Sequence, residues 1–330
     1  MFVFVGRGRS LAASGTLAAV LVAALVGPVS AHGRPAGELT LRTALTNWTV
    51  EPALLLALSI GLGLYLFAVR RVDRVHPRNP VPRRRVVAWL AGLAVVAIAS
   101  FSVLDAYADE LFSVHMVQHL LLTMVAPPML LQGAPITLLL RGASSARRRR
   151  WILPVLDSRA VRALTHPLLG WVGFALVMWG SHFSPLFDAA LADDGVHAAE
   201  HALFLGAGLL FWLPVAGVDP SPHRLGHAAR VGYLLLSLPQ NSFLGLAIFS
   251  APAVLYPHYA GLVRAWGPTP LEDQQLAGGL MWAAGDLLFL VPLLVLVAAW
   301  FRSEERRGRQ HDERLDRERA RRDATGRSAP

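Results

Sequence analysis

The chain has 330 residues, of which 54% are hydrophobic and 16% are charged, and its mean hydropathy is +0.45. This composition excludes a single soluble domain and indicates an all-α polytopic membrane protein. The absence of cysteine excludes disulfides, thiolate metal sites and cysteine nucleophiles. The net charge of +9 comes from arginines that cluster between apolar stretches, a pattern that reports membrane topology and not nucleic-acid binding.

The first predicted element is an N-terminal apolar segment. Arg7 and Arg9 precede it, and small residues ending at Ala31 follow it. This order is typical of a signal peptide over residues 1–31, and an uncleaved signal anchor helix fits equally well. Cleavage after Ala31 would leave His32 as the amino terminus on the outer face.

Seven further apolar stretches within residues 46–300 each approach the ~20 residues that a membrane-spanning helix needs. We expect spans at Pro52–Val69, Val86–Leu104, Leu111–Leu131, His166–Ser184, His197–Val215, Val231–Ser250 and Leu276–Trp300. The prediction is therefore an integral membrane bundle of seven transmembrane helices, preceded by the signal peptide or extra helix.

Charge in the loops predicts the orientation of this bundle. Arginine-rich loops follow the first, third, fifth and seventh spans, and acidic loops follow the others. By the positive-inside rule the arginine-rich loops and the C-terminus are cytoplasmic. Residues 301–330 mix arginine with aspartate and glutamate and have almost no apolar stripe, which favours a frayed or disordered cytoplasmic tail.

Two histidine pairs with equal spacing are the strongest functional signal. His115 with His119 and His197 with His201 lie near the outer ends of two spans, and His182 ends another span on the same side. Residues at i and i+4 project from one helix face, so each pair can place two imidazoles on one metal ion. Because imidazoles are costly in a bilayer, we expect a metal site in the outer leaflet, in preference to separate hydrogen bonds between helices.

Three other side chains near these histidines are candidate metal ligands, although methionine in a helix is more often packing. They are Met116, Met178 and Glu200. Histidine with methionine and without thiolate suits copper, whereas four histidines with a glutamate equally suit zinc or non-haem iron. The residues alone therefore favour copper only modestly over zinc or iron.

Other functions remain open on the same residues. His197-x-x-Glu200-His201 matches the H-x-x-E-H pattern of zinc metalloproteases, in which the glutamate activates water, but it leaves the first pair unexplained. A copper transporter would use polar groups such as Asn241 and Asp286 farther along the membrane, while a structural Asp286 would bond Asn241 or a serine. A haem site is disfavoured because same-face partners cannot ligate opposite sides of one haem.

Two proline-containing stretches are expected to disturb their helices. Pro239, with Gln240 and Asn241, is expected to interrupt the sixth span, and Pro127-Pro128 to kink or end the third.

Several motifs together resemble the seven-span CtaG family of cytochrome c oxidase assembly factors, over about Thr46 to Trp300. They are His115-Met-Val-Gln-His119-Leu-Leu-Leu, Pro127-Pro128, Gly133-Ala-Pro135, His197-x-x-Glu200-His201-x-x-Phe204 and Phe211-Trp212-x-Pro214. The resemblance implies a multi-pass protein of the bacterial cell membrane that is an assembly factor and not an enzyme. It implies copper as the cofactor, with His115, His119, His197 and His201 as the matching candidate metal residues.

The expected mechanism is ligand exchange. Copper from an unidentified donor would be held by the imidazoles of two spans with His182 or Met178, and passed to the catalytic subunit of the oxidase, docked laterally in the lipid bilayer. If cleavage occurs after Ala31, the amine and imidazole of His32 would provide an entry site.

Overall fold

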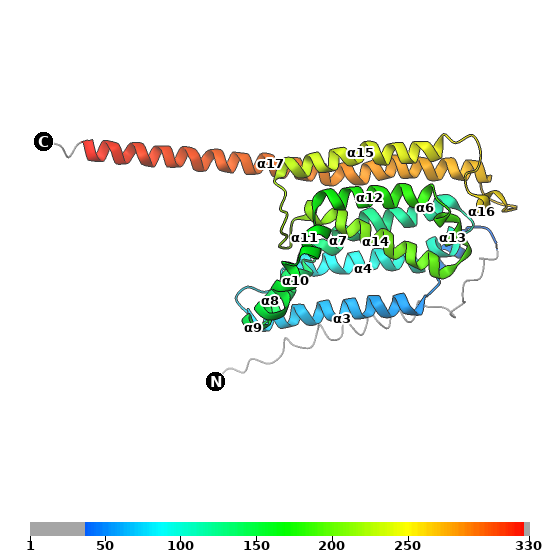
Figure 1. The fold of residues 1–330 in the computed structure, drawn as a ribbon, viewed down its shortest axis with the longest axis horizontal. Coiled ribbons are helices and arrows are strands. Elements are labelled where there is room, and N and C mark those ends of the chain that lie inside the picture. The colour runs from blue at the N-terminus through cyan, green and yellow to red at the C-terminus, as the bar shows by residue number, and fades with distance from the viewer. Residues whose placement is uncertain (1–36, 327–330) are drawn as a thin grey trace.

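The computed structural model describes residues 37–326, which form helices, turns and loops (Figure 1). The predicted signal segment and His32 lie outside these residues. The first half of the chain contains α2 (Leu41–Thr46), α3 (Pro52–Val75), α4 (Arg83–Phe101), α5 (Val103–Ala108), α6 (Phe112–Leu120), the π-helix η1 (Leu121–Val125), α7 (Ala126–Gln132) and α8 (Pro135–Gly142). The chain continues with α9 (Ser145–Arg147), the π-helix η2 (Arg148–Ile152), α10 (Leu153–Leu156), α11 (Arg159–Leu164), α12 (Pro167–His182), α13 (Leu186–Ala192), α14 (Asp194–Ala216), α15 (His227–Phe249), α16 (Pro257–Ala260) and α17 (Pro270–Gly326).

The described residues include six segments long and apolar enough to cross a membrane, which confirms a polytopic helical bundle. These segments are Pro52–Val75, Arg83–Ala108, Phe112–Gly142, Asp194–Ala216, His227–Phe249 and Pro270–Glu318. The remaining expected span is α12, which has 16 residues. At 1.5 Å per residue α12 is about 24 Å long, shorter than the ~30 Å hydrocarbon core, so the predicted count of seven is not confirmed.

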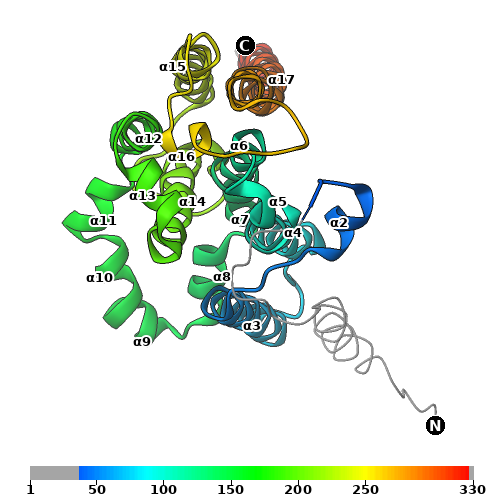
Figure 2. The ribbon, with the colours of Figure 1, turned by 90° about the vertical axis from the view of Figure 1, so that its right-hand side faces the viewer.

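The main hydrophobic core lies between α6, α12, α14, α15 and α17. α15 and α17 run side by side along one flank of the bundle, and α3 lies at the opposite edge (Figures 1 and 2). The contact between α15 and α17 requires glycine at Gly278. A Cβ there would lie 2.5 Å from the backbone nitrogen of Phe249. Small residues at such crossings let two membrane helices approach closely.

Proline affects two of these helices differently. The π-turn η1 directly precedes Pro127-Pro128, and α7 then continues to Gln132. The chain stays helical from α6 through η1 into α7, so the predicted disturbance at Pro127-Pro128 takes the form of a π-turn and does not end the helix. The expected interruption at Pro239 is wrong, since α15 is continuous around it.

The polar groups of α15 bind to α17. Asn241 Nδ2 donates to Asp286 Oδ1 at 3.0 Å, and Ser242 Oγ donates to Asp286 Oδ2 at 2.6 Å. Asp286 is therefore a hydrogen-bond partner of Asn241 and a serine, as its structural interpretation predicts.

The predicted disorder of the tail is wrong for the described residues 301–326. α17 runs without a break to Gly326 and projects beyond the rest of the bundle (Figure 1). Charged side chains three or four residues apart pair along its exposed surface, among them Arg307 with Glu304 at 2.9 Å and Arg317 with Glu313 at 3.3 Å. Such pairs support a helix that has no apolar stripe.

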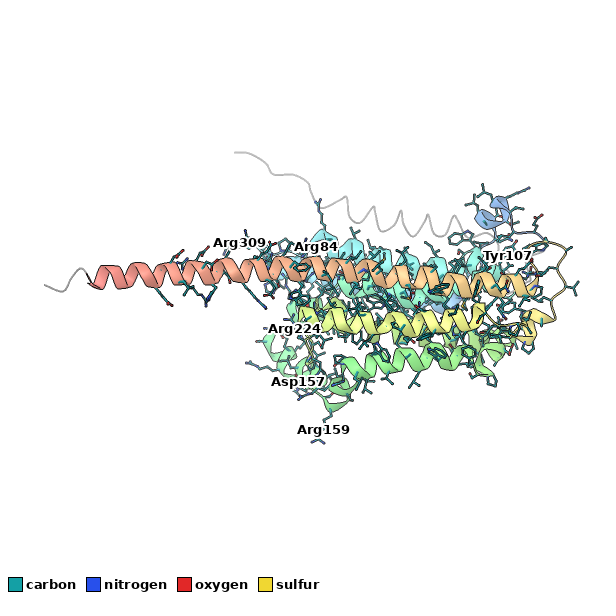
Figure 3. The ribbon with its side chains drawn as sticks, turned by 90° about the horizontal axis from the view of Figure 1, so that it is seen from above. Arg84, Tyr107, Asp157, Arg159, Arg224 and Arg309 are labelled. Carbon is teal, nitrogen blue, oxygen red and sulfur yellow. The ribbon has the colours of Figure 1, made fainter. Side chains whose placement is uncertain are left out.

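The two ends of the bundle differ in character. Arginines gather where α3 ends and α4 begins, along α8 to α11 and before α15; Arg84, Arg159 and Arg224 mark this arginine-rich end in Figure 3. The paired histidines lie at the starts of α6 and α14, and His182 lies at the end of α12. We call this opposite end the histidine end.

A carboxylate from α17 fixes the start of α6. Asp273 Oδ2 accepts the backbone N–H of Phe112 at 2.6 Å, and Asp273 Oδ1 accepts the hydroxyl of Ser113 at 2.5 Å. Asp273→Ala leaves these buried donors without an acceptor, at a cost of about 2 kcal/mol. We expect the melting temperature in detergent to fall by roughly 4–8 °C. The exposed tail variant Glu305→Ala is the control, and equal melting temperatures for both variants would refute this capping role.

Candidate metal centre

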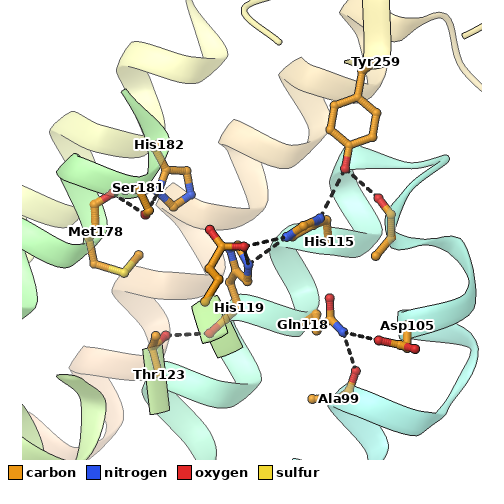
Figure 4. A network of polar contacts seen from close by, with 12 residues as sticks. Ala99, Asp105, His115, Gln118, His119, Thr123, Met178, Ser181, His182 and Tyr259 are labelled. Carbon is orange, nitrogen blue, oxygen red and sulfur yellow. Dashed lines mark hydrogen bonds and ion pairs between the residues drawn. The ribbon is translucent and has the colours of Figure 1, made fainter. Parts of the chain in front are cut away.

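Three helices bring five imidazoles and one carboxylate together at the histidine end. α6 contributes His115 and His119 and α12 contributes His182, which are labelled in Figure 4. α14 contributes His197, Glu200 and His201. Four of the imidazoles and the carboxylate are buried, with His115 fully enclosed. His201 is the partly exposed member.

The donor atoms of α6 and α14 converge within the bundle. His115 Nε2 lies 2.8 Å from His119 Nε2, and Glu200 Oε2 lies 3.9 and 3.7 Å from these two nitrogens. Ligand atoms of His115, His197 and Glu200 all lie within 4.8 Å of one another. Donors that share one ion at a bond length near ~2.0 Å are separated by roughly 3–4 Å, so this arrangement needs only small shifts to enclose a metal.

Several buried nitrogen and oxygen atoms in this cluster, all of which can bind a metal, have no hydrogen-bond partner among the described residues. They are His119 Nδ1, His182 Nε2, His197 Nε2, His201 Nε2 and both carboxylate oxygens of Glu200. An unsatisfied buried polar group costs about 1–3 kcal/mol, and native proteins keep few of them. Because the atoms concentrate at one place and all of them are metal-ligand atoms, the cluster fits a bound cation.

Comparison with known proteins agrees with the motifs. Residues 63–303 match Caa3_CtaG, the cytochrome c oxidase caa3 assembly factor family. The chain belongs to this family. The match confirms the resemblance read from the histidine and proline motifs, and it covers all six residues of the cluster.

Relatives of this family member occur in mycobacteria. Uncharacterized proteins of Mycobacterium bovis and Mycobacterium tuberculosis are each 31% identical over 287 residues, which is 84% of this chain and 43% of theirs. A Mycobacterium leprae protein is 31% identical over 267 residues, covering 79% of this chain and 40% of its own length. The chain thus spans less than half the length of these relatives. No solved structure matches it.

Contacts behind the imidazoles determine which nitrogen faces the cluster. His182 Nδ1 lies 2.6 Å from the carbonyl oxygen of Met178, so Nδ1 carries the proton and Nε2 keeps a free lone pair. Tyr259 donates its hydroxyl to the carbonyl oxygen of Ala108 at 2.6 Å, and His115 Nδ1 lies 3.3 Å from the same hydroxyl. Burial raises the pKa of Tyr259 well above 10, so the hydroxyl stays protonated and accepts from His115 Nδ1. Both histidines therefore present Nε2 as a ligand.

Tyr259→Phe removes the acceptor that orients His115. We expect metal affinity to fall by roughly 10–100-fold, as for other partners of metal-bound histidines. The Nδ1-protonated form of His115 should also lose population in nitrogen NMR spectra. Tyr256→Phe is the matched control, because Tyr256 donates to the backbone oxygen of His182 at 3.2 Å and not to an imidazole. Equal affinity in the two variants would contradict this positioning role.

Aromatic side chains enclose the cluster. Phe187 of α13 lies against His115 and His182, at ring-centroid distances of 4.9 and 5.7 Å. On the side facing the arginine-rich end, Phe204 packs 4.2 Å from the ring of His119. Beyond Phe204 follows an apolar layer of buried residues from α12, α14 and α17: Phe174, Phe211, Trp212 and Phe289. We call this layer the aromatic floor.

The two methionines predicted as ligands lie in apolar packing. Met116 and Met178 are 1% and 2% exposed and belong to the main hydrophobic core. Ligation by their sulfurs stays a prediction, and the contact given for Met178 is through its backbone oxygen to His182.

Other residues that shape the centre are not among the predicted ones. Tyr259 and Phe187 lie on short helices of two loops, where no sequence spacing signals their contact with α6. Gln118 lies between the paired histidines, and its Nε2 donates to the carbonyl oxygen of Ala99 at 2.8 Å. A glutamine next to two intramembrane histidines is a polar signal of its own, and here it anchors α6 to α4.

Proposed function

We propose that this protein is a membrane assembly factor that binds copper at the histidine cluster and delivers it to the catalytic subunit of a haem-copper cytochrome c oxidase. One observation carries the proposal: five imidazoles and a carboxylate converge with unpaired donor atoms inside the bundle. Membership of the cytochrome c oxidase caa3 assembly factor family supports the oxidase as the partner. The role is one of binding and transfer, without catalysis.

Copper is the metal that fits both the ligand atoms of the histidine cluster and an assembly role for a haem-copper oxidase. The chain offers no thiolate, and neutral imidazoles bind copper in exchangeable coordination. A delivery protein has to release its cargo, and ligand exchange between imidazoles of two proteins needs no other chemistry.

The proposed docking route is lateral, near α14. Positive-inside asymmetry supports a cytoplasmic C-terminus and a histidine end toward the outer face. His201 is the most exposed imidazole of the cluster, and the neighbouring Ala198 and Ala202 are exposed on the same helix. Small residues let a partner helix approach closely, so an oxidase subunit can dock beside His201 within the bilayer.

Two alternative functions have less support. A copper transporter needs a polar path toward the arginine-rich end, but the aromatic floor lies below the cluster, and Asp286 is engaged by Asn241 and Ser242. In a zinc protease with this motif, Glu200 would activate a water molecule and would not bind the metal. Here Glu200 Oε2 lies 3.9 and 3.7 Å from the Nε2 atoms of His115 and His119, close enough to share a metal ion with them.

Metal content tests the proposal directly. The full chain, purified in detergent and exposed to equal copper and zinc, is compared with His115→Ala/His119→Ala and His197→Ala/His201→Ala. The control is His166→Ala/His223→Ala, a pair whose rings lie 4.9 Å apart at the arginine-rich end. We expect copper in the native and control proteins and none in the other two. Zinc that persists without His115 and His119 would favour the protease, and absence of any metal would overturn the proposal.

Transfer separates delivery from transport. Copper-loaded protein is mixed in detergent with copper-depleted oxidase catalytic subunit, which we expect to gain copper. In sealed vesicles without an oxidase, we expect no passage of radioactive copper across the membrane. Passage in the native protein, lost in the histidine variants, would favour the transporter instead.

A further inference from the structure

The cluster contains more ligand atoms than one copper ion uses. Five imidazoles and both oxygens of Glu200 converge there, and six of their atoms have no partner among the described residues. Copper held by imidazoles takes about four ligands. A single ion would leave two or more of these buried ligand atoms without any partner, each at a cost of about 1–3 kcal/mol.

The donors divide into two groups by position. The first ligand group is His115, His197 and Glu200, whose ligand atoms lie within 4.8 Å of one another. The second ligand group is His119, His182 and His201. The ring of His119 lies 5.9 Å from that of His182 and 6.3 Å from that of His201, between centroids. Two imidazoles on one ion, with metal–nitrogen bonds near ~2.0 Å, have centroids roughly 5–6 Å apart. The second ligand group, unlike the first, therefore has to draw its three rings closer together before all of them can bind one ion.

Each imidazole of the second ligand group has one unpaired nitrogen, namely His119 Nδ1, His182 Nε2 and His201 Nε2. His119 is the residue that separates the groups, because its Nε2 faces His115 at 2.8 Å while its Nδ1 is free. Coordination through Nδ1 leaves the proton on Nε2, which lies 3.7 Å from the carboxylate of Glu200. His119 can therefore bind one ion while the first ligand group binds another.

We propose that this centre holds two copper ions, one in each ligand group, with Glu200 between them. Both oxygens of Glu200 lack a hydrogen-bond partner among the described residues, and a carboxylate can contact two metal ions about 3.5–4 Å apart. The negative charge of Glu200 offsets part of the repulsion between the ions. This inference rests on the proposed copper-binding function and adds the number and distribution of the ions.

The test is the stoichiometry of Cu(I) bound by the full chain in detergent, measured by competition with a coloured Cu(I) chelator. We expect two ions per native chain and one in His182→Leu. Because His182 is buried and its variant can misfold, the partly exposed His201→Ala provides a second measurement, also with one ion expected. His166→Ala/His223→Ala is the control and should keep both. X-ray absorption of the loaded native protein should show copper–copper scattering, which is lost in both single variants.

The outcomes separate the two proposals. Saturation of the native chain at one ion would overturn the two-ion centre and leave copper delivery standing. Two ions in the native chain and in both single variants would overturn the second ligand group. Absence of bound copper would overturn both the centre and the delivery function.

Discussion

Gly208→Leu is expected to prevent accumulation of folded protein. Gly208 lies on α14 where this helix crosses η1 and α7, and a Cβ there would lie 2.6 Å from the carbonyl oxygen of Thr123 and 2.7 Å from Pro127 Cγ. Backbone at this crossing cannot move alone, because Trp212 Nε1 also donates to the oxygen of Thr123 at 3.1 Å. Separating the helices costs at least about 3 kcal/mol.

Fluorescence-detected gel filtration and thermal unfolding in detergent measure this effect. Gly206→Leu is the matched control, since Gly206 lies two residues away on the same helix and a Cβ there meets open space. We expect near-normal yield for Gly206→Leu and strongly reduced yield for Gly208→Leu. Similar behaviour of the two variants would refute the close crossing of α14 with η1.

Glu200→Leu is expected to stabilise the metal-free protein and to weaken copper binding. Both oxygens of Glu200 are buried without a hydrogen-bond partner, so an apolar side chain of similar size removes a penalty of about 1–3 kcal/mol. The metal-free melting temperature should rise by roughly 3–8 °C. Copper affinity should fall by roughly 100-fold through loss of a charged ligand.

Asp286→Leu is the control for this prediction. Asp286 is also a carboxyl group within the bundle, but it accepts hydrogen bonds from Asn241 and Ser242. We expect Asp286→Leu to lower the metal-free melting temperature and leave copper affinity unchanged. A destabilised metal-free Glu200→Leu protein would mean that Glu200 supports the fold by itself, independently of metal.

The sequence predicts the bundle and its six long spans because each span needs ~20 apolar residues, a property of local composition. The histidine pairs can be predicted from the sequence in the same way, since spacing alone places His115 with His119, and His197 with His201, on one face of their helix. Their shared depth predicts convergence across helices, and two contacts between α6 and α14 agree with it: the rings of His115 and His197 lie 5.2 Å apart between centroids, and His119 Nε2 lies 3.7 Å from Glu200 Oε2.

The errors arise where tertiary or surface effects outweigh composition. Pro239 leaves α15 helical because neighbouring helices support the chain around it, which no local rule contains. The tail is helical through charge pairs such as Arg317 with Glu313, although it has no apolar stripe. Tyr259 contacts His115 although the two residues are 144 positions apart in the chain, and no periodic sequence pattern predicts such a contact.

The aromatic floor limits how the proposed delivery can proceed in time. Phe204 and the residues beneath it close the cluster toward the arginine-rich end, and His201 is its most exposed imidazole. If the proposed copper enters and leaves beside His201, donor and oxidase compete for the same place and bind in turn, never together. The transfer should follow double-displacement kinetics, with parallel double-reciprocal plots and with each partner inhibiting at high concentration by blocking the other.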